Sequence, residues 1–202
     1  MNNPLRICIT LDSRSTGGIE THVLHQASAL MKAGLTVAIV FVEDHGNHPL
    51  LEALHMRGIQ ARFMDGRIST LRRFFRQWGA DLVHSHGYRA SILSRIATLF
   101  IPVRHFGTYH AGDRHRGKLG LYDWIDRHTA FMSAHTFCVS QEIATRLPVR
   151  TTVLDNFIDL PEVAQKCARQ IAFVGRLSHE KGPDRLLELT ERLPGLRIHV
   201  YG

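Results

Sequence analysis

Two histidines one residue apart follow a short apolar run in DLVHSHGYRAS, residues 81–91. In open α/β sheets, ligands gather beyond the carboxyl ends of the strands, and His86 is expected at such an end. Strand alternation points His84 and His86 the same way until the turn begins. A metal site would need further ligands, and His110 and His115 stand at spacings that do not support one. His86 can therefore be a structural histidine or a ligand-binding one.

A diglycine lies between the first apolar run and the first helix-like stretch, in STGGIETHV, residues 15–23. Gly17 and Gly18 allow the backbone to approach a ligand closely, and a helix N-terminus offers unpaired N–H groups. Both features suit a phosphate. The pattern is neither GxGxxG nor a Walker loop, because no lysine follows the glycines. Alone, it fits a tight turn as well as an anion site.

A third candidate is the loop in AFVGRLSHEKGPDRLL, residues 172–187. A buried strand leads to Gly175, and Pro183 marks a helix start, because proline is favoured at the first helical position. Arg176 and Lys181 then share one loop at the carboxyl end of a strand. Two cations there could bind a diphosphate and stabilise the charge that builds on it as a leaving group. A solvated charged loop is the alternative.

The elements that must position these residues alternate along the chain. The strand-like runs are mostly apolar throughout, which is typical of strands covered on both faces. They span residues 5–11, 35–42, 59–64, 81–84, 103–108, 135–139, 151–154, 170–174 and 196–201. Helix-sized stretches span residues 19–33, 50–57, 68–78, 88–100, 119–132, 141–146 and 184–193. This alternation predicts an α/β fold with a Rossmann-like, doubly wound parallel sheet.

A polar, aperiodic segment with a proline, residues 155–168, interrupts the alternation. We therefore expect a first domain over residues 1–160, a linker over 161–169, and the start of a second Rossmann-like domain over 170–202. A single strand–helix–strand unit cannot bury a core of its own.

The bulk composition limits the possible partners. The 202 residues carry a net charge of +7, which suits anionic partners such as phosphate-bearing substrates, acidic lipids or nucleic acid. No basic stripe interleaved with stacking aromatics is present, so we expect no specific nucleic-acid binding. Three scattered cysteines predict neither a disulfide framework nor a cysteine metal site. No signal-peptide pattern opens the chain, which favours a cytoplasmic protein.

One helix-sized stretch, ISTLRRFFRQWG at residues 68–79, combines an apolar stripe with arginines. Basic, aromatic helices of this kind can lie on anionic membranes, which would place the protein at the inner face of the membrane. The alternative is that the stripe packs on the sheet, as helices of such folds do.

The motifs together resemble the retaining glycosyltransferases of family 4, which have the GT-B fold. The resemblance rests on GGIETHV, DLVHSHG, GTYHA, FCVSQEI, LDNFID and VGRLSHEKGPDRLL, and it extends over nearly the whole chain. The last motif is the most specific. The resemblance as a whole implies transfer of a sugar, with retention, from a nucleotide-diphosphate-sugar donor. The acceptor would be a glycan, a lipid-linked molecule or a small molecule in cell-surface polysaccharide or glycolipid synthesis.

The resemblance also implies roles for individual residues. Gly17 and Gly18 match the loop that approaches the donor phosphates, and His86 matches the histidine that faces the donor sugar. Arg176 and Lys181 match the pair that grips the diphosphate. No cofactor and no divalent metal is expected, because these two cations replace the metal and a donor phosphate oxygen takes the acceptor proton. From its position after a strand, His110 is a further candidate for acceptor binding.

The chain departs from the family at one point. The family's second domain also supplies a glutamate pair in an E-x7-E pattern and most of the nucleoside pocket, and we assign neither glutamate of that pair to a position in this sequence. We therefore expect little or no transfer by the 202-residue chain alone. Two alternatives are a non-catalytic truncated paralogue and a basic membrane- or nucleic-acid-binding module. A third is a nucleotide-sugar epimerase, but the HSHG and GRL–EKG patterns argue against it.

Overall fold

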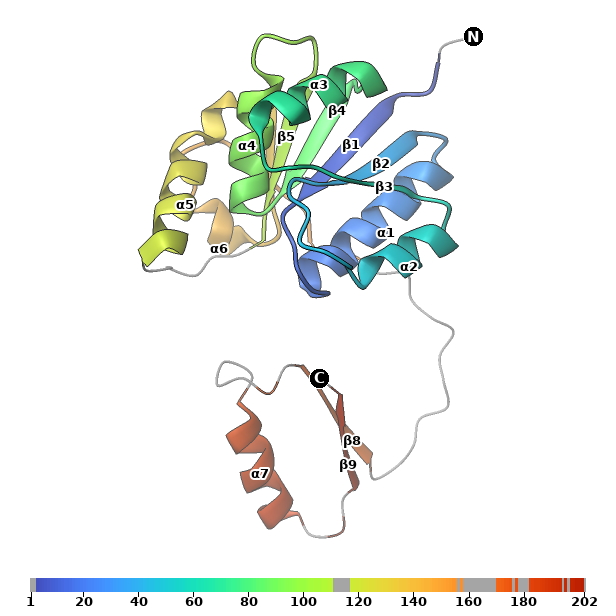
Figure 1. Cartoon of the computed structure of the whole chain (residues 1–202). Coiled ribbons are helices and arrows are strands. Elements are labelled where there is room, and N and C mark those ends of the chain that lie inside the picture. Colours follow the sequence, from blue (N-terminus) through green and yellow to red (C-terminus); the bar gives the residue numbers. More distant parts are fainter. Residues whose placement is uncertain are drawn as a thin grey trace. The chain divides into compact units, whose positions relative to one another are not determined.

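A computed structural model of the chain describes residues 3–110, 117–155, 157, 170–175, 177, 182–193, 195 and 197–201. The chain divides into two compact units, Met1–Asp159 and Leu160–Gly202 (Figure 1). The segment expected as a linker, residues 161–169, lies outside the described residues, as do Arg176, Lys181 and His115.

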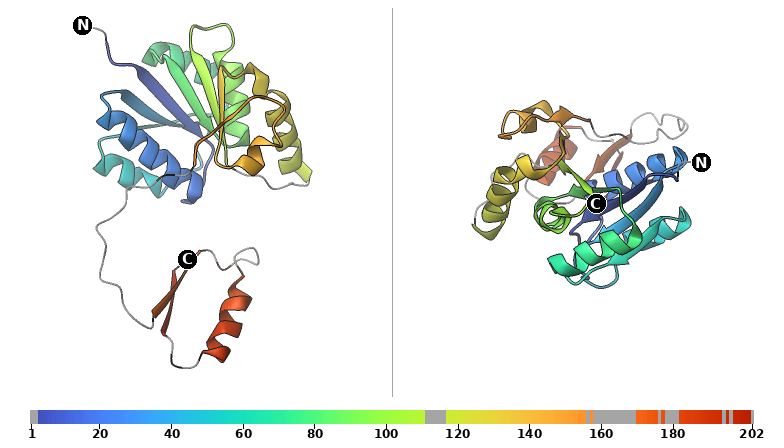
Figure 2. Two further views of the ribbon diagram at one scale, coloured as in Figure 1. Left: turned by 180° about the vertical axis from the view of Figure 1, so that it is seen from behind. Right: turned by 90° about the horizontal axis from the view of Figure 1, so that it is seen from above.

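The first unit is built on one parallel sheet of seven strands in the order β3-β2-β1-β4-β5-β6-β7. From behind, this order is visible as the change from blue through green to orange across the sheet (Figure 2). The strands are β1 Arg6–Leu11, β2 Thr36–Phe41, β3 Gln60–Phe63, β4 Leu82–His86, β5 Arg104–Tyr109, β6 His135–Cys138 and β7 Thr152–Val153. The order reverses between β1 and β4, and such a switch point is where open α/β sheets bind ligands.

Helices cover both faces of this sheet, as the apolar runs of the sequence predict. The helices of the unit are α1 Gly18–Lys32, α2 Leu50–Met56, α3 Ile68–Trp78, α4 Tyr88–Thr98, α5 Gly117–His128 and α6 Gln141–Ala144, with a 3-10 turn, η1, at Ala130–Met132. Ile7 and Ile9 of β1 face the core formed with α1 and α2. Cys8, between them, faces the core formed with α3 and α4. The doubly wound parallel sheet is thus confirmed.

The apolar stripe of α3 packs on the sheet. Leu71 and Phe75 are fully buried, and Ile68, Phe74 and Trp78 are partly buried against the same core. The apolar side chains of an amphipathic helix are buried in this way when the helix covers a sheet. This is the packing alternative that the sequence left open. Arg73 and Arg76 are exposed, whereas Arg72 is half-buried and donates to the backbone carbonyls of Ile96 and Ala97.

A buried ion pair joins α4 to α5. Arg95 is 2% exposed, and its Nη2 donates to Oδ1 of Asp126 over 2.5 Å. The same guanidinium donates to the hydroxyls of Tyr109, Thr129 and Ser133. A buried guanidinium with so many acceptors fixes α5 against the sheet, because every hydrogen bond left open in the interior is costly.

The second unit contains β8 Gln170–Val174, α7 Pro183–Arg192 and β9 Arg197–Tyr201, with β8 and β9 paired in parallel. These are the predicted strand, helix and strand. No described residue of α7 is buried, and Val174 is 77% exposed. Two strands and one helix therefore leave apolar side chains of this unit exposed to solvent, as expected for so small a unit.

Two further observations bear on the sequence-based expectations. The thiols of Cys8 and Cys138 are free and buried, and Cys167 lies outside the described residues. Within the described ranges, no helix has both the length and the apolar character needed to cross a bilayer.

Candidate functional site at the carboxyl edge of the first sheet

His84 and His86 lie at the carboxyl end of β4, and their ring centroids are 4.6 Å apart on the same side of the strand. His84 is held by protein groups on both ring nitrogens. Its Nδ1 lies 3.0 Å from the amide nitrogen of Gln26, and its Nε2 lies 2.7 Å from the hydroxyl of Thr108. His84 is therefore a structural residue that fixes the end of β4.

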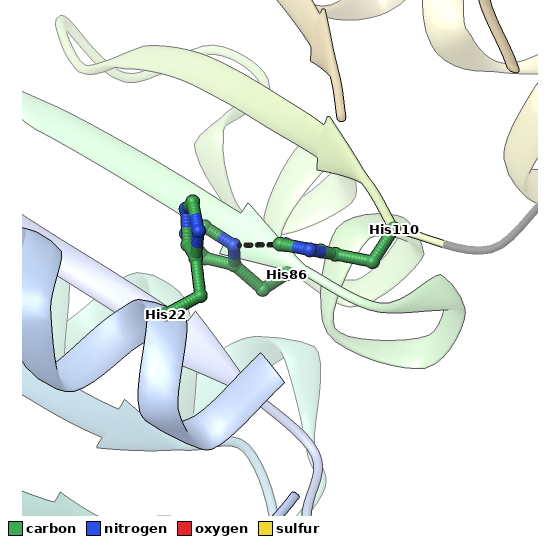
Figure 3. A group of neighbouring side chains, drawn as sticks. All are labelled: His22, His86 and His110. Carbon is green, nitrogen blue, oxygen red and sulfur yellow. Dashed lines mark hydrogen bonds between the residues drawn. The ribbon is translucent and has the colours of Figure 1, made fainter. Parts of the chain in front are cut away.

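His86 belongs to a cluster of three imidazoles drawn from three elements (Figure 3). His22 comes from the second turn of α1, His86 from the end of β4, and His110 directly follows β5. The ring centroids are 5.4 Å apart for His22 and His86, 4.8 Å for His22 and His110, and 5.1 Å for His86 and His110. Nδ1 of His86 lies 2.8 Å from Nε2 of His110. The structure thus brings two of the predicted site residues together.

His86 and His110 are uncharged at neutral pH. Burial, with the neighbouring histidines adding to it, lowers the pKa of His86 well below its usual value. Burial lowers the pKa of His110 to about 3. Neutral imidazoles can exchange hydrogen bonds with sugar hydroxyls or offer a lone pair, but they cannot neutralise a phosphate. Diphosphate charge must therefore be met by other groups.

Gly17 and Gly18 stand at the start of α1, as predicted. Both are exposed, and Gly17 is the N-cap in an extended conformation without a side-chain cap hydrogen bond. A Cβ at Gly18 would meet no atom within 4 Å, whereas one at Gly17 would lie 3.0 Å from Oε2 of Glu20. The first N–H groups of the helix are thus accessible to an anion, although the Glu20 carboxylate shares the space at Gly17.

A charged cluster lies at the same edge, and the sequence did not indicate it. Asp12 follows β1, Glu43 follows β2 and Arg89 opens α4. Arg89 Nη1 donates to Oδ2 of Asp12 over 3.0 Å and also to Glu43, while Nε2 of His45 lies 2.7 Å from Oδ1 of Asp12. The only signal in the sequence was their place directly after strands or at a helix start, which many solvated residues share.

These residues line a cavity of about 590 Å³. Its walls combine charged and hydroxyl-bearing groups with the apolar side of α5. The lining residues are Asp12, Ser13, Arg14, Glu43, His45, Arg89, Lys118, Leu119 and Tyr122. Carboxylates that accept, cations that donate, and an aromatic ring are the groups that bind a polyhydroxylated ligand.

Residues 16–160 match the sequence model of Glycosyltransferase Family 4. The chain belongs to this family. The match includes Gly17, Gly18, the imidazole cluster and most of the charged cavity. A comparison with curated proteins gave no match.

Solved structures show that the family 4 chain has the GT-B fold. It is similar to Anabaena HepE in complex with UDP-glucose, with 14% identity and a TM-score of 0.74 over 97% of this chain and 59% of HepE. It is also similar to a glycosyltransferase from Rickettsia africae ESF-5, with 15% identity and a TM-score of 0.65 over 100% of this chain and 69% of that one. The chain thus spans about three fifths of the length of HepE.

The fold alone does not identify the reaction. A putative UDP-N-acetylglucosamine 2-epimerase from Listeria monocytogenes is similar over 99% of this chain and 69% of its own, with 12% identity and a TM-score of 0.61. Transferases and an epimerase therefore share this architecture. Membership of family 4 rests on the sequence match over residues 16–160, which favours the glycosyltransferase over the epimerase that the sequence left open.

Proposed function

We propose that the protein transfers a sugar, with retention of anomeric configuration, from a nucleotide-diphosphate-sugar donor to a glycan, lipid-linked or small-molecule acceptor in cell-surface polysaccharide or glycolipid synthesis. The observation that carries the proposal is the family 4 match across the residues that build the carboxyl-edge site. HepE was crystallised with UDP-glucose and with UDP and glucose, so UDP-glucose is the first donor to test.

In this proposal, the charged cavity binds the acceptor. Arg89 already neutralises much of the charge of Asp12 and Glu43, so the carboxylates can accept hydroxyl hydrogen bonds without an isolated buried charge. Tyr122, from α5, offers a ring against which a sugar face can pack. The acceptor would thus lie next to the imidazole cluster.

The donor is proposed to lie with its sugar near His86 and its diphosphate near the start of α1. His86 and His110 are neutral, so they can orient hydroxyl groups but do not supply charge. Arg176 and Lys181, both outside the described residues, are the proposed cations for the diphosphate. As they would stabilise the leaving group, no metal ion or cofactor is needed for transfer in this proposal.

Membrane contact remains part of the proposal and has a candidate location on α5. Leu121 and Trp124 are 58% and 57% exposed, and Phe131, in the following η1 turn, is 73% exposed. Leu121 and Trp124 are three residues apart and therefore lie on the same side of α5, and Phe131 follows the end of the helix. Flotation with anionic vesicles at low salt tests this contact, and the triple change to serine should abolish it. Equal flotation of the variant would contradict the α5 location.

The transfer reaction is tested with the protein as its coding frame encodes it, whether or not that frame extends past residue 202. It is incubated with UDP-glucose and a panel of glycan and lipid-linked acceptors, and products are analysed by NMR. An α-linked product from the α-configured donor supports retention, and a β-linked product contradicts it. Absence of donor binding and of product with every nucleotide sugar tested would overturn the proposed function. The 202-residue chain, assayed in parallel, tests the expectation that it transfers little sugar by itself.

A further inference from the structure

We propose that His22, His86 and His110 form a binding site for a divalent transition-metal ion of the zinc class. Three imidazoles from α1, β4 and the end of β5 offer ligand nitrogens that all lie within 4.8 Å of one another. Imidazole nitrogen suits Zn²⁺, Cu²⁺ and Ni²⁺, whereas Mg²⁺ prefers oxygen ligands. Three histidines and an open fourth position make up one known type of zinc site.

The spacing of the rings matches such a site. With a Zn–N distance of about 2.0–2.1 Å and tetrahedral angles, each ring centroid lies about 3.2 Å from the ion and the centroids lie about 5.2 Å apart. The observed separations, 4.8, 5.1 and 5.4 Å, lie on both sides of that value. Ring rotations, rather than backbone movement, would therefore be enough to admit an ion.

Hydrogen bonding within the cluster is compatible with an ion. Nδ1 of His86 and Nε2 of His110 face each other over 2.8 Å, and two zinc ligands would lie about 3.3 Å apart, so the pair would open by about half an ångström. The proton between them moves to the other nitrogen of its own ring, and both rings stay neutral. Among the described residues, Nε2 of His86 is buried without a hydrogen-bond partner. This nitrogen is not one of the facing pair, so it would carry the ring proton and would not bind the ion.

Charge distinguishes this cluster from the neighbouring one. Asp12, Glu43 and His45 also lie close enough together to hold an ion, but Arg89 already supplies the positive charge there. The imidazole cluster contains no such cation. Phe157 lies 5.1 Å from His22, ring to ring, and adds an apolar wall to the site. An apolar shell of this kind strengthens metal binding by limiting solvent access.

A bound ion would affect the transfer reaction by competition. It would sit beside His86, where the donor sugar is expected, so metal occupancy should raise the apparent KM for the donor. This consequence rests on the proposed function. Metal binding itself does not, and the two can fail independently.

The site is tested by direct binding to the metal-free chain. Titration with Co²⁺ should give visible d–d absorption of a four-coordinate, nitrogen-ligated ion, and Zn²⁺ should displace it at one equivalent per chain. Mg²⁺ should not compete. His22→Phe and His110→Phe keep an aromatic ring but remove the ligand nitrogens, and each should weaken Zn²⁺ binding by more than about 100-fold, since loss of an outer-shell partner alone costs 10–100-fold.

The matched control is His25→Phe, because His25 lies one turn from His22 on the same helix and outside the cluster. Circular dichroism identifies any variant that fails to fold, and either of the two cluster variants is then sufficient. The site is overturned if the wild-type chain binds no Co²⁺, or if a folded cluster variant binds Zn²⁺ as tightly as the wild-type chain does. Donor binding measured on the metal-free chain separates that result from failure of the proposed function.

Discussion

Acidification from pH 7.5 to 5.5 should destabilise the first unit strongly, because histidines in its core are buried in the neutral form. His84, His86 and His105 are at most 5% exposed. Burial lowers the pKa of His84 to about 3 and those of His86 and His105 well below the usual value of 6.5. The unfolded chain regains ordinary histidines, so between these pKa values the unfolded state binds more protons than the folded one. Stability is then present above pH 6.5 and is lost as the pH falls.

The size of the effect follows from proton linkage. A histidine that titrates at 6.5 when unfolded and stays neutral when folded loses about 1.4 kcal/mol of stabilisation between pH 7.5 and 5.5. Three such groups lose about 4 kcal/mol, and His110, whose pKa burial lowers to about 3, adds about 1.4 kcal/mol. Asp126 opposes this, because burial raises its pKa to about 6 and Arg95 only partly reverses that rise. Its contribution is about 0.8 kcal/mol in favour of the folded state at pH 5.5. The net loss of about 4.6 kcal/mol is a large share of an ordinary domain's stability of about 5–15 kcal/mol.

The measurement is urea unfolding followed by circular dichroism at both pH values, with EDTA present to keep the imidazole cluster free of metal. With a slope of about 1–3 kcal/mol per molar urea, the midpoint should fall by about 1.5–4.6 M. His105→Gln should reduce the pH-dependent loss by about 1.4 kcal/mol, whatever it does to absolute stability. Exposed His55→Gln is the control and should leave the loss unchanged. Equal or greater stability at pH 5.5 would refute the assignment of neutral, buried histidines.

Three further predictions concern the ion pair, the diglycine and the charged cavity. Arg95→Met should cost about 3–5 kcal/mol at pH 7.5, because Asp126 is left as an unpaired buried charge, and less at pH 5, where that carboxyl is protonated; thermal unfolding at both pH values checks this. Gly18→Ala should leave the melting temperature unchanged, because its Cβ meets no atom, and should raise the donor KM if the backbone there approaches the diphosphate; an unchanged KM would contradict that role. Arg89→Gln should raise the acceptor KM more than it changes the donor KM, because its guanidinium orients Asp12 in the cavity; steady-state kinetics with each substrate varied measures the difference.

The sequence predicts the elements well because the strands are buried on both faces and read as uninterrupted apolar runs. The main departure is β4, expected to end at His84 and found to continue to His86. Polar residues at the end of a run normally indicate that a strand has finished. Here the hydrogen bonds of His84 to Gln26 and Thr108 make burial of a polar strand end possible. These partners are distant in sequence, so no local pattern could reveal them.

Contacts between residues distant in sequence also explain which site residues could not be predicted from the sequence. His86 and His110 could be predicted because each follows an apolar run that ends at the carboxyl edge. His22 could not, because it lies within the regular pattern of a helix and gains its significance only from the two rings beside it. Arg89 is similar, since its carboxylate partners come from loops after two other strands. Parallel topology brings such loops together, whereas their spacing in the sequence does not.

Charge divides the carboxyl edge into two neighbouring parts, and this division limits how a nucleotide-sugar could bind. His86 and His110 are neutral, and in the charged cavity Arg89 is already shared between Asp12 and Glu43. Arg14 and Lys118 are the other cations that line this cavity. We infer that the first unit mainly recognises hydroxyl groups, with the start of α1 as an anion-favouring feature near the cluster. The diphosphate would then depend on Arg176 and Lys181, so their replacement should lower donor affinity far more than acceptor affinity, whereas changes in the cavity should do the reverse.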